Sequence, residues 1–405
     1  MPLTATTSKH YCSYNAKQLL NAVLIYSLTA LLFISGCKKA DNQQFYEVIE
    51  NTPITDADIH LIGDVHNLPL TSQKIFVPDN VKTGGYAYAS VLRLNDSSLM
   101  VACTRYPANS FGDFNHSDIA ARISHDNGAT WEPEFVLQEN IGLINTCNPN
   151  LVRITNKKIV LIFCVKDSDS KIDILIKESE DNGVTWGSPR LINKLTWGYH
   201  IVNNDRAIYN NGRLIVPAAY AVSITKDYDK QVIFCYYSDD QGKTWRKSSY
   251  LKADFALMEP GVTAINKNGK LKMNIRTKQG FIYFSTSDDN GMTWKGLFKS
   301  NINTPEAPQV VTSLNKSDSL MMIWINTPYT PGMNNRNPLT FAYSTNAGQQ
   351  WQNPVNLRNN KDLNFLYPTI YKDRNDTIMV TYGVRDITFR PSIYLDRLSL
   401  KTLIK

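Results

Sequence analysis

The chain has 405 residues, a length at which a folded domain can bury a large hydrophobic core. Hydrophobic residues make up 42% and aromatic residues 11%, and helical periodicity is scarce after the first 36 residues, which favours an all-β protein. The formal net charge is +7, and positive and negative residues are mixed along the chain without basic blocks. This charge is compatible with an anionic ligand and gives no indication of nucleic acid.

The first 37 residues have the pattern of an export signal. Residues 1–17 are polar, residues 19–34 are apolar, and Gly36-Cys37 follows. An apolar core followed by small residues is typical of a cleaved secretory signal, and the Gly-Cys ending resembles a bacterial lipobox. A transmembrane anchor is the alternative, but about 16 apolar residues fall short of the ~20 that a spanning helix needs. We therefore expect a lipoprotein signal peptide over residues 1–37 that ends at Cys37.

This expectation fixes the compartment and the remaining domain boundaries. A lipidated Cys37 at the mature amino terminus would anchor the protein to a membrane, in the periplasm or at the cell surface. Residues 38–60 are polar and are predicted to be a tether, and residues 61–405 are predicted to be the folded domain.

One short pattern, S-x-D-x-G-x-T-W, recurs along the chain and predicts a modular fold. Its copies occupy residues 124–131, 179–186, 238–245 and 287–294, and a degenerate copy occupies residues 344–351. The tryptophans of successive copies are 55, 59, 49 and 57 residues apart. A repeat of this period is typical of β-propellers, in which each blade is one four-stranded sheet.

The residue types in the pattern indicate a fastened β-hairpin turn. Asp or Asn before Gly supplies a tight turn, the Ser and Thr hydroxyls can close local hydrogen bonds, and Trp can pack on a neighbouring repeat. Residues 232–237 and 281–284, which precede two of the copies, have the β-branched and aromatic composition of strands. A catalytic role for the five acidic or amide positions is excluded because one active site does not need five equivalent copies.

Four cysteines remain after Cys37, and we expect them to be buried free thiols. Cys103, Cys147, Cys164 and Cys235 are widely spaced, and three of them lie in apolar runs. An exported protein can form disulfides, so a bridge such as Cys103 to Cys147 stays possible. Without a C-x-x-C or His/Cys cluster, we expect no metal site and no other cofactor.

The repeated motif resembles the Asp boxes of sialidases and their relatives, and the resemblance extends from about residue 70 to the carboxyl terminus. It implies a six-bladed β-propeller with its Asp boxes on the rim opposite the active site. It also implies a nucleophilic tyrosine with a partner glutamate, an aspartate as acid and base, and three arginines that hold the substrate carboxylate. Asp boxes also occur in propellers without activity, so they specify the fold and not the chemistry.

Four residues match the family pattern in order and spacing. Glu259, in Met-Glu-Pro-Gly-Val, resembles the partner glutamate, and Arg276 follows as the second arginine of the triad. Arg336 resembles the third arginine, and Tyr367 falls where the nucleophile is expected. A surface position for the charged residues and core packing for Tyr367, one of 21 tyrosines, are the alternatives.

The acid and base aspartate has two candidates. Asp113 follows Arg105 on a segment that resembles the mobile loop of the family, and Asp118 is the weaker candidate five residues later. Either could also be an ordinary loop carboxylate.

The first arginine of the triad is replaced in this chain. Counting back from Arg105 and Asp113 puts Tyr88 at its position, and Arg93 is an odd number of residues away, so strand alternation directs it to the opposite face. A bidentate arginine contact is worth roughly 1.5 to 3 kcal/mol, so this loss weakens the expected grip on a carboxylate. Tyr88 could instead contact a sugar ring.

The segment 197–206 resembles the sugar-facing stretch of bacterial sialidase-like proteins. His200, Asn204 and Arg206 could line the pocket, with Arg206 as a substrate-binding residue. A hydrogen-bonded loop between blades is the alternative interpretation.

The sequence thus predicts an exported, exo-acting glycoside hydrolase, expected to be a monomer, that cleaves a terminal sialic acid or related acidic sugar from glycans. Tyr367, Glu259 and Asp113 would be catalytic, and Arg276, Arg336, Tyr88 and Arg206 would bind the substrate. The alternatives are a carbohydrate-binding propeller without catalysis and a glycosidase for a different sugar.

Overall fold

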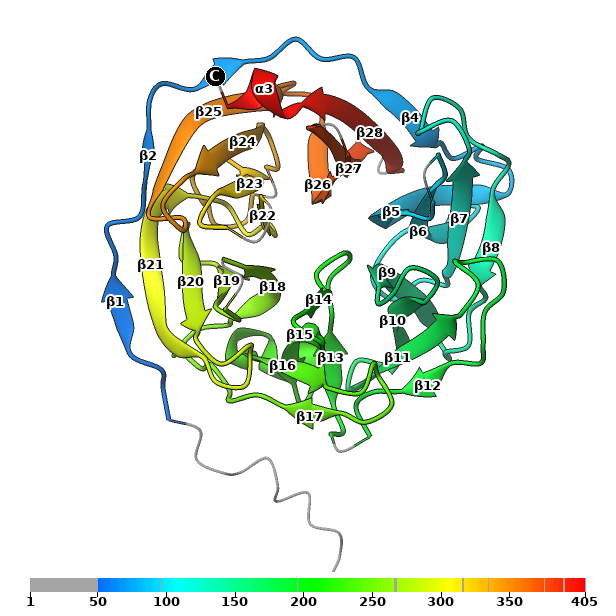
Figure 1. Cartoon of the computed structure of the whole chain (residues 1–405), viewed down its shortest axis with the longest axis horizontal. Helices are drawn as coiled ribbons and strands as arrows, with labels where there is room; N and C mark the ends of the chain where they lie inside the picture. The colour runs from blue at the N-terminus through cyan, green and yellow to red at the C-terminus, as the bar shows by residue number, and fades with distance from the viewer. Residues whose placement is uncertain are drawn as a thin grey trace, which may run out of the picture. The chain divides into compact units, whose positions relative to one another are not determined.

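Six β-sheets arranged around a central axis make up nearly all of the folded chain in the computed structural model (Figure 1). This confirms the predicted six-bladed β-propeller. The structure describes residues 50–404 except 96, 195, 266–267, 315–316, 334, 375 and 389. The expected signal peptide, Cys37 and the first part of the expected tether lie outside the described residues. Within the described part, no helix is long and apolar enough to cross a membrane.

We number the blades 1 to 6 in the order of their inner strands along the chain. Blade 1 consists of β5 (Thr83–Arg93), β6 (Leu99–Pro107), β7 (Asp118–Ser124) and β8 (Phe135–Gln138). Blade 2 consists of β9 (Asn145–Arg153), β10 (Ile159–Ser168), β11 (Lys171–Ser179) and β12 (Arg190–Leu191). Blade 3 consists of β13 (Tyr199–Ile201), β14 (Ile208–Asn210), β15 (Arg213–Ala221), β16 (Val232–Ser238) and β17 (Arg246–Lys247).

The other three blades follow the same antiparallel plan. Blade 4 contains β18 (Met258–Ala264), β19 (Leu271–Arg276), β20 (Phe281–Ser287) and β21 (Lys295–Asn303). Blade 5 contains β22 (Val310–Ser313), β23 (Leu320–Ile325), β24 (Leu339–Ser344) and β25 (Gln350–Arg358). Blade 6 contains β26 (Asn364–Lys372), β27 (Thr377–Arg385) and β28 (Ser392–Ser399), with β4 (Gln73–Phe76) as its outer strand. The short helices are α2 (Ile224–Asp227), η2 (Tyr228–Lys230) and α3 (Leu400–Leu403).

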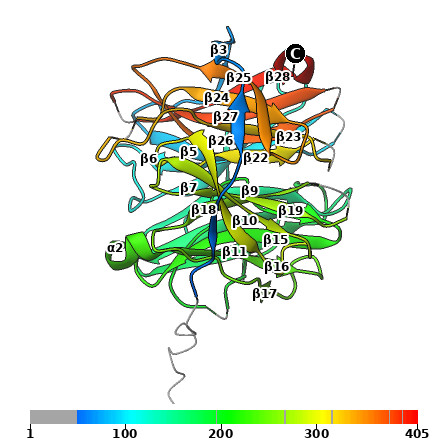
Figure 2. The ribbon, with the colours of Figure 1, turned by 90° about the vertical axis from the view of Figure 1, so that its left-hand side faces the viewer.

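The segment before blade 1 runs along the outside of the ring and closes it. β1 (Ile54–Asp56) pairs in parallel with β21, and β2 (His60–Ile62) and β3 (His66–Asn67) pair in parallel with β25 (Figures 1 and 2). β4 then pairs antiparallel with β28, so blade 6 is closed by strands from both ends of the domain. We call residues 54–67 the N-terminal belt. Residues 54–60, the end of the segment expected to be a tether, belong to this belt, and strand pairing with the blades begins at Ile54.

The repeated motif forms the hairpin turn between the last two strands of each of blades 1 to 5. In blade 4, the Ser287 hydroxyl donates to Asp289 Oδ1 at 2.8 Å, and the Thr293 N–H and hydroxyl donate to the same carboxylate at 2.9 and 2.6 Å. The fifth copy keeps the geometry with Asn346 in place of Asp. These hydrogen bonds confirm that the motif is a structural turn.

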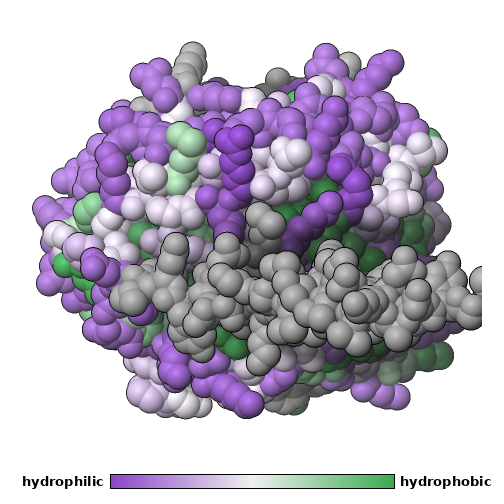
Figure 3. All heavy atoms as spheres, turned by 90° about the horizontal axis from the view of Figure 1, so that it is seen from below, coloured by the Kyte–Doolittle hydropathy of each residue, from purple (hydrophilic) through white to green (hydrophobic). Residues whose placement is uncertain are grey.

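Apolar side chains fill the interfaces between neighbouring blades. The fully buried Trp351 of the fifth motif packs with Phe284 of blade 4 and Trp324 of blade 5. The face seen in Figure 3 is mostly hydrophilic, and the apolar side chains visible there lie in small separate groups. Because the blades bury their apolar faces against one another, the polar ends of the inner strands and the loops around the axis can carry a site.

Candidate active site

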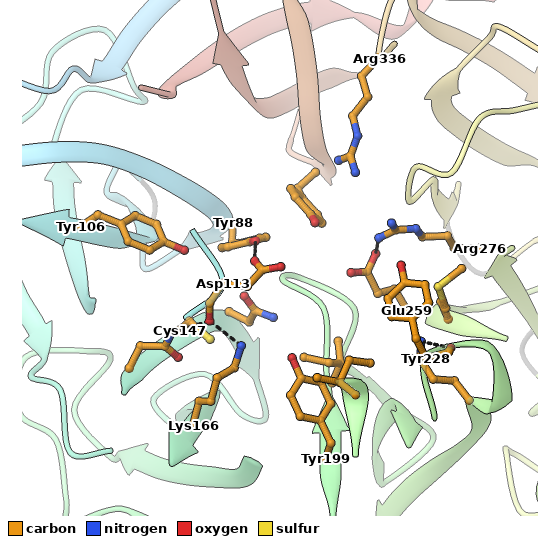
Figure 4. Close-up of a pocket in the computed structure, with 17 residues that line it drawn as sticks. Tyr88, Tyr106, Asp113, Cys147, Lys166, Tyr199, Tyr228, Glu259, Arg276 and Arg336 are labelled. Atoms are coloured by element: carbon orange, nitrogen blue, oxygen red, sulfur yellow. Dashed lines mark hydrogen bonds and ion pairs between the residues drawn. The ribbon is translucent and has the colours of Figure 1, made fainter. Parts of the chain in front are cut away.

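A cavity of about 180 Å³ lies among the inner strands and the loops around the axis (Figure 4). Six of the seven residues predicted to be catalytic or substrate-binding line it: Tyr88, Asp113, Glu259, Arg276, Arg336 and Tyr367. Two larger hollows, of about 490 and 580 Å³, are lined by other residues. The chemistry of the lining, and not the size of the hollow, therefore identifies the candidate site.

Four inner strands direct side chains into the cavity by the same local device. Tyr88, Asn148, Glu259 and Tyr367 have positive φ angles of 57°, 58°, 39° and 49°. Each lies where the register of the inner strand shifts against the next strand, which is a β-bulge. A bulge turns a side chain out of the regular alternation, and a non-glycine residue at positive φ costs of order 1 to 3 kcal/mol, so the surrounding fold must hold these four residues in place.

Tyr367, the proposed nucleophile, contacts one tyrosine, Tyr88, and one arginine, Arg336. The rings of Tyr367 and Tyr88 meet edge to face with their centroids 4.4 Å apart. The Arg336 guanidinium lies over the Tyr367 ring, 5.3 Å from its centroid. Burial and the negative charge of Glu259 raise the pKa of Tyr367, while Arg336 and Arg276 act in the opposite direction. The Tyr367 hydroxyl therefore keeps its proton at neutral pH until a base removes it.

Among the carboxylates, Glu259 has the largest effect on the pKa of Tyr367, and it forms an ion pair with Arg276. Arg276 Nη1 donates to Glu259 Oε2 at 2.6 Å, and Arg276 Nη2 donates to Glu306 Oε1 at 3.1 Å. The Tyr228 hydroxyl also donates to Glu306. Burial alone would lower the pKa of Arg276, but Glu259, Tyr367 and Glu306 raise it well above its usual value. Arg276 is thus a permanent cation that is already shared between two carboxylates.

Asp113 lies on the loop between β6 and β7, across the cavity from Arg276 (Figure 4). The Tyr88 hydroxyl donates to Asp113 Oδ1 at 3.2 Å. The alternative candidate Asp118 accepts two hydrogen bonds from Arg105, at 2.9 and 2.6 Å, and lines a different hollow. Of the two aspartates, only Asp113 lines the cavity with Tyr367 and Glu259.

Two arginines considered for the site lie elsewhere. Arg206 is 2% exposed and does not line the cavity, and its Nη2 donates to the Pro368 carbonyl at 3.2 Å. Burial lowers the pKa of Arg206 to about 10. Arg93 forms a buried bidentate pair with Asp373, away from the cavity, as the strand alternation predicted. Direct contact of Arg206 with a ligand stays a prediction, while its observed contact is with the backbone beside Tyr367.

The other residues of the segment 197–206 are divided between the wall and the interior. Tyr199 lines the cavity, whereas His200 is fully buried. His200 Nδ1 lies 3.2 Å from the Ile172 carbonyl, and its Nε2 lies 3.1 Å from the Tyr236 hydroxyl. Asn204 Nδ2 donates to the Ala89 carbonyl at 2.6 Å. Within this segment, Tyr199 and Ile201 line the cavity, whereas His200 and Asn204, which were expected to line it, contact protein groups.

The sequence reasoning missed several residues of the cavity wall. Among them are Asn145, Cys147, Asn148 and Lys166 of blade 2. A signal for Asn148 was present: Asn148-Pro-Asn-Leu, Glu259-Pro-Gly-Val and Tyr367-Pro-Thr-Ile share one pattern at equivalent bulges. Cys147 and the other three cysteines of the described chain are buried and unbridged, as expected. The described residues contain no cluster of His, Cys, Asp and Glu arranged to hold a metal ion.

The chain is similar to a known protein family and to several known proteins. The family model of BNR repeat-like domains matches residues 115–380, more than half of the chain. A sialidase of Bacteroides fragilis (strain YCH46) is 24% identical over 258 residues, which cover 59% of this chain and 44% of that protein. A sialidase of Trypanosoma cruzi is 26% identical over 218 residues, which cover 46% of this chain and 18% of that protein. The chain thus spans less than half the length of these two relatives.

The solved structures support the same architecture. A Hadza microbial sialidase superposes with a TM-score of 0.69 over 82% of this chain and 69% of that chain, at 16% identity. Likeness at this level of identity establishes the fold, and the residues of the cavity have to carry the argument about chemistry.

Proposed function

The chain belongs to the family of BNR repeat-like domains, and on that premise we propose that it is an exo-acting glycoside hydrolase that removes a terminal sialic acid or related acidic sugar from glycans. One observation carries the proposal. Tyr367, Glu259 and Asp113 line a single cavity together with two arginines, although they come from blades 1, 4 and 6. Strained bulges and buried charges are concentrated at this one cavity, which favours a chemical role.

The proposed reaction begins at Tyr367. A sugar with a carboxylate on its anomeric carbon would repel an anionic nucleophile, whereas a neutral phenol avoids that repulsion. Glu259 would take the phenol proton as the oxygen of Tyr367 attacks the anomeric carbon, and Asp113 would give a proton to the departing glycan oxygen. Water activated by Asp113 would then release the sugar from Tyr367, and the proton on Glu259 would return to the phenol.

Arg276 and Arg336 are proposed to hold the acidic group of the sugar. Both are less than 9% exposed and line the cavity, so their guanidinium groups are positioned before a ligand binds. Arg276 is shared with Glu259 and Glu306, and Tyr88 stands where the family has a further arginine. The carboxylate grip is therefore proposed to be weaker than one made by three arginines.

The cellular setting is part of the proposal. Export through the predicted signal peptide and lipidation of Cys37 would place the propeller outside the cytoplasm, tethered to a membrane, where glycan termini are accessible. We propose that the propeller acts there as a monomer.

The reduced grip favours a second candidate function from another class, a carbohydrate-binding propeller without turnover. The occupation of Arg276 by two carboxylates is the specific observation behind it. A hydrolase for a different sugar, with Tyr88 against the ring, is a variant of the first proposal.

Release of 4-methylumbelliferone from its α-sialoside distinguishes these candidates. The full chain should release the fluorophore, and Tyr367→Phe should abolish release while the protein stays folded by circular dichroism. An undiminished rate in Tyr367→Phe would remove Tyr367 from the mechanism. Binding of the sialoside without release by either protein would support the carbohydrate-binding alternative.

A further inference from the structure

Lys166 of blade 2 is a buried cation in the wall of the candidate active site. It lies near the end of β10, is 3% exposed and lines the cavity beside Asp113 (Figure 4). Burying an ammonium group is costly unless other groups compensate the charge. The groups that contact the Lys166 ammonium and compensate its charge therefore indicate the role of this residue.

The hydrogen bond and the ring contacts of the Lys166 ammonium join it to the loop that carries Asp113 and to the adjoining wall of the cavity. Lys166 Nζ donates to the backbone carbonyl of Asp113 at 2.6 Å, a short distance typical of a charge-assisted hydrogen bond. The same ammonium lies 4.4 Å from the ring centroid of Phe114 and 5.3 Å from that of Tyr199. Cation–π contacts of this kind are attractive, and they strengthen when water is excluded.

A second side chain of blade 2 holds the same carbonyl. Asn145 Nδ2 donates to the carbonyl of Asp113 at 2.9 Å and to that of Asn115 at 3.1 Å. The loop 108–117 belongs to blade 1, so these bonds bind it to the neighbouring blade at the backbone of Asp113 and two residues later. From the opposite side, the Tyr88 hydroxyl reaches Asp113 Oδ1. The backbone and the carboxylate of Asp113 are thus fixed separately.

We infer that Lys166 is a positioning residue that fixes the Asp113 loop so that the carboxylate meets the departing glycan oxygen. This inference rests on the proposed function, because it assigns Asp113 the role of general acid. A proton donor has to lie within hydrogen-bond reach of the leaving oxygen, and misplacement by about 1 Å can cost a factor of about 100. Lys166 acts through the carbonyl of Asp113 and through the Phe114 ring.

The dependence of the rate on the leaving group tests this inference. A sugar alcohol leaves only when an acid protonates it, whereas 4-nitrophenolate leaves without a proton. Lys166→Met should lower kcat/KM for sialyllactose by about 10- to 100-fold and for 4-nitrophenyl α-sialoside by less than threefold. Asp113→Asn should show the same asymmetry more strongly, and Lys166→Arg should restore most of the loss. Lys171→Met, a lysine substitution on the next strand outside the cavity, is the matched control and should change neither rate.

Equal losses on both substrates, or no loss on either, would overturn the inference. A second readout separates it from the proposed function. Amide hydrogen exchange in residues 108–117 should be at least tenfold faster in Lys166→Met than in the parent and in Lys171→Met. Should the parent hydrolyse neither substrate, the proposed function fails and the exchange result alone decides whether Lys166 fixes the loop. Unchanged exchange would then overturn this inference as well.

Discussion

Tyr88 occupies the position to which the sialidase resemblance assigns an arginine, and it lines the candidate site. Its hydroxyl donates to Asp113 and its ring contacts Tyr367, so it touches two of the three residues proposed to react. An arginine at this position would point a third guanidinium into the cavity. The substitution exchanges a cation for a neutral hydrogen-bond donor and an aromatic edge, which lowers the affinity expected for a carboxylate.

The change Tyr88→Arg tests this interpretation at the residue scale. We expect the unsaturated sialic acid analogue DANA to bind about 10- to 100-fold more tightly, because a charge-assisted bond to a carboxylate contributes roughly 1.5 to 3 kcal/mol. Isothermal titration calorimetry gives the dissociation constants, and Tyr88→Phe controls for loss of the hydroxyl. Affinity for DANA that is unchanged or weaker in Tyr88→Arg would show that position 88 does not set the carboxylate grip.

His200 gives a pH dependence whose direction follows from its burial. Burial lowers its pKa to about 4, from 6.5 in an exposed histidine, because the charged ring would lose its contact with water, while the hydrogen bond to the Ile172 carbonyl acts in the opposite direction. Between pH 6.5 and 4 the unfolded chain binds this proton and the folded chain does not. The contribution of His200 to the free energy of unfolding should therefore fall by about 3 kcal/mol as the pH decreases through this window.

Urea denaturation of the parent and His200→Asn at pH 7 and pH 4 measures this contribution. The parent should lose more stability than the variant over this interval. The comparison is needed because Asp205, whose pKa burial raises to about 6, has the opposite pH dependence in both proteins. Equal losses in the two proteins would contradict the assignment of a neutral buried imidazole.

At the scale of strands and turns, the sequence predicted the fold because each blade repeats its own local signals. The Asp boxes specify the hairpins, and the expected strands 232–237 and 281–284 lie within β16 and β20. The family resemblance predicted Glu259, Arg276, Arg336 and Tyr367 as site residues, and all four line the cavity. These predictions succeed because turn chemistry and strand composition are local properties.

The parts of the site that the sequence did not reveal depend on contacts between blades. Lys166 follows the apolar run of β10 from Ile159 to Val165, and its contact with the Asp113 loop joins blades 1 and 2. Arg206 was predicted to bind substrate, yet its guanidinium contacts the Pro368 carbonyl of blade 6. Neither the depth of a side chain nor its partner in another blade follows from residue type and spacing alone.

At the scale of the whole molecule, the N-terminal belt joins blades 4 and 5 from outside before the chain enters blade 6 and blade 1. Its Ile59 is 2% exposed and belongs to the same apolar cluster as Trp324 and Trp351. Parallel pairing with β21 and β25 continues the sheets outward, so the belt contributes both backbone hydrogen bonds and buried apolar surface. Because it lies on the outer edge, it should stabilise the ring without touching the cavity.

Ile59→Ala and Ile62→Ala form a matched pair for this claim. Ile59→Ala should lower the free energy of unfolding by about 2 to 4 kcal/mol, because it removes a buried side chain and leaves a cavity. Ile62 is 41% exposed, so Ile62→Ala should lower the free energy of unfolding by less than about 1 kcal/mol. Urea denaturation measures both, and hydrolysis rates at 25 °C should be unchanged. A loss below about 1 kcal/mol in Ile59→Ala would mean that the belt adds little to the stability of the ring.

The most direct test of the central claim is covalent trapping of the proposed nucleophile. 2,3-Difluorosialic acid carries an activated leaving group, and its remaining fluorine slows release of the sugar from the enzyme. Intact-mass and peptide mass spectrometry of the full chain should show one added sugar on the peptide that contains Tyr367, and Tyr367→Phe should remain unlabelled. Absence of labelling in the parent, or labelling of another residue, would contradict the assignment of Tyr367 as the nucleophile of a sialidase-type hydrolase.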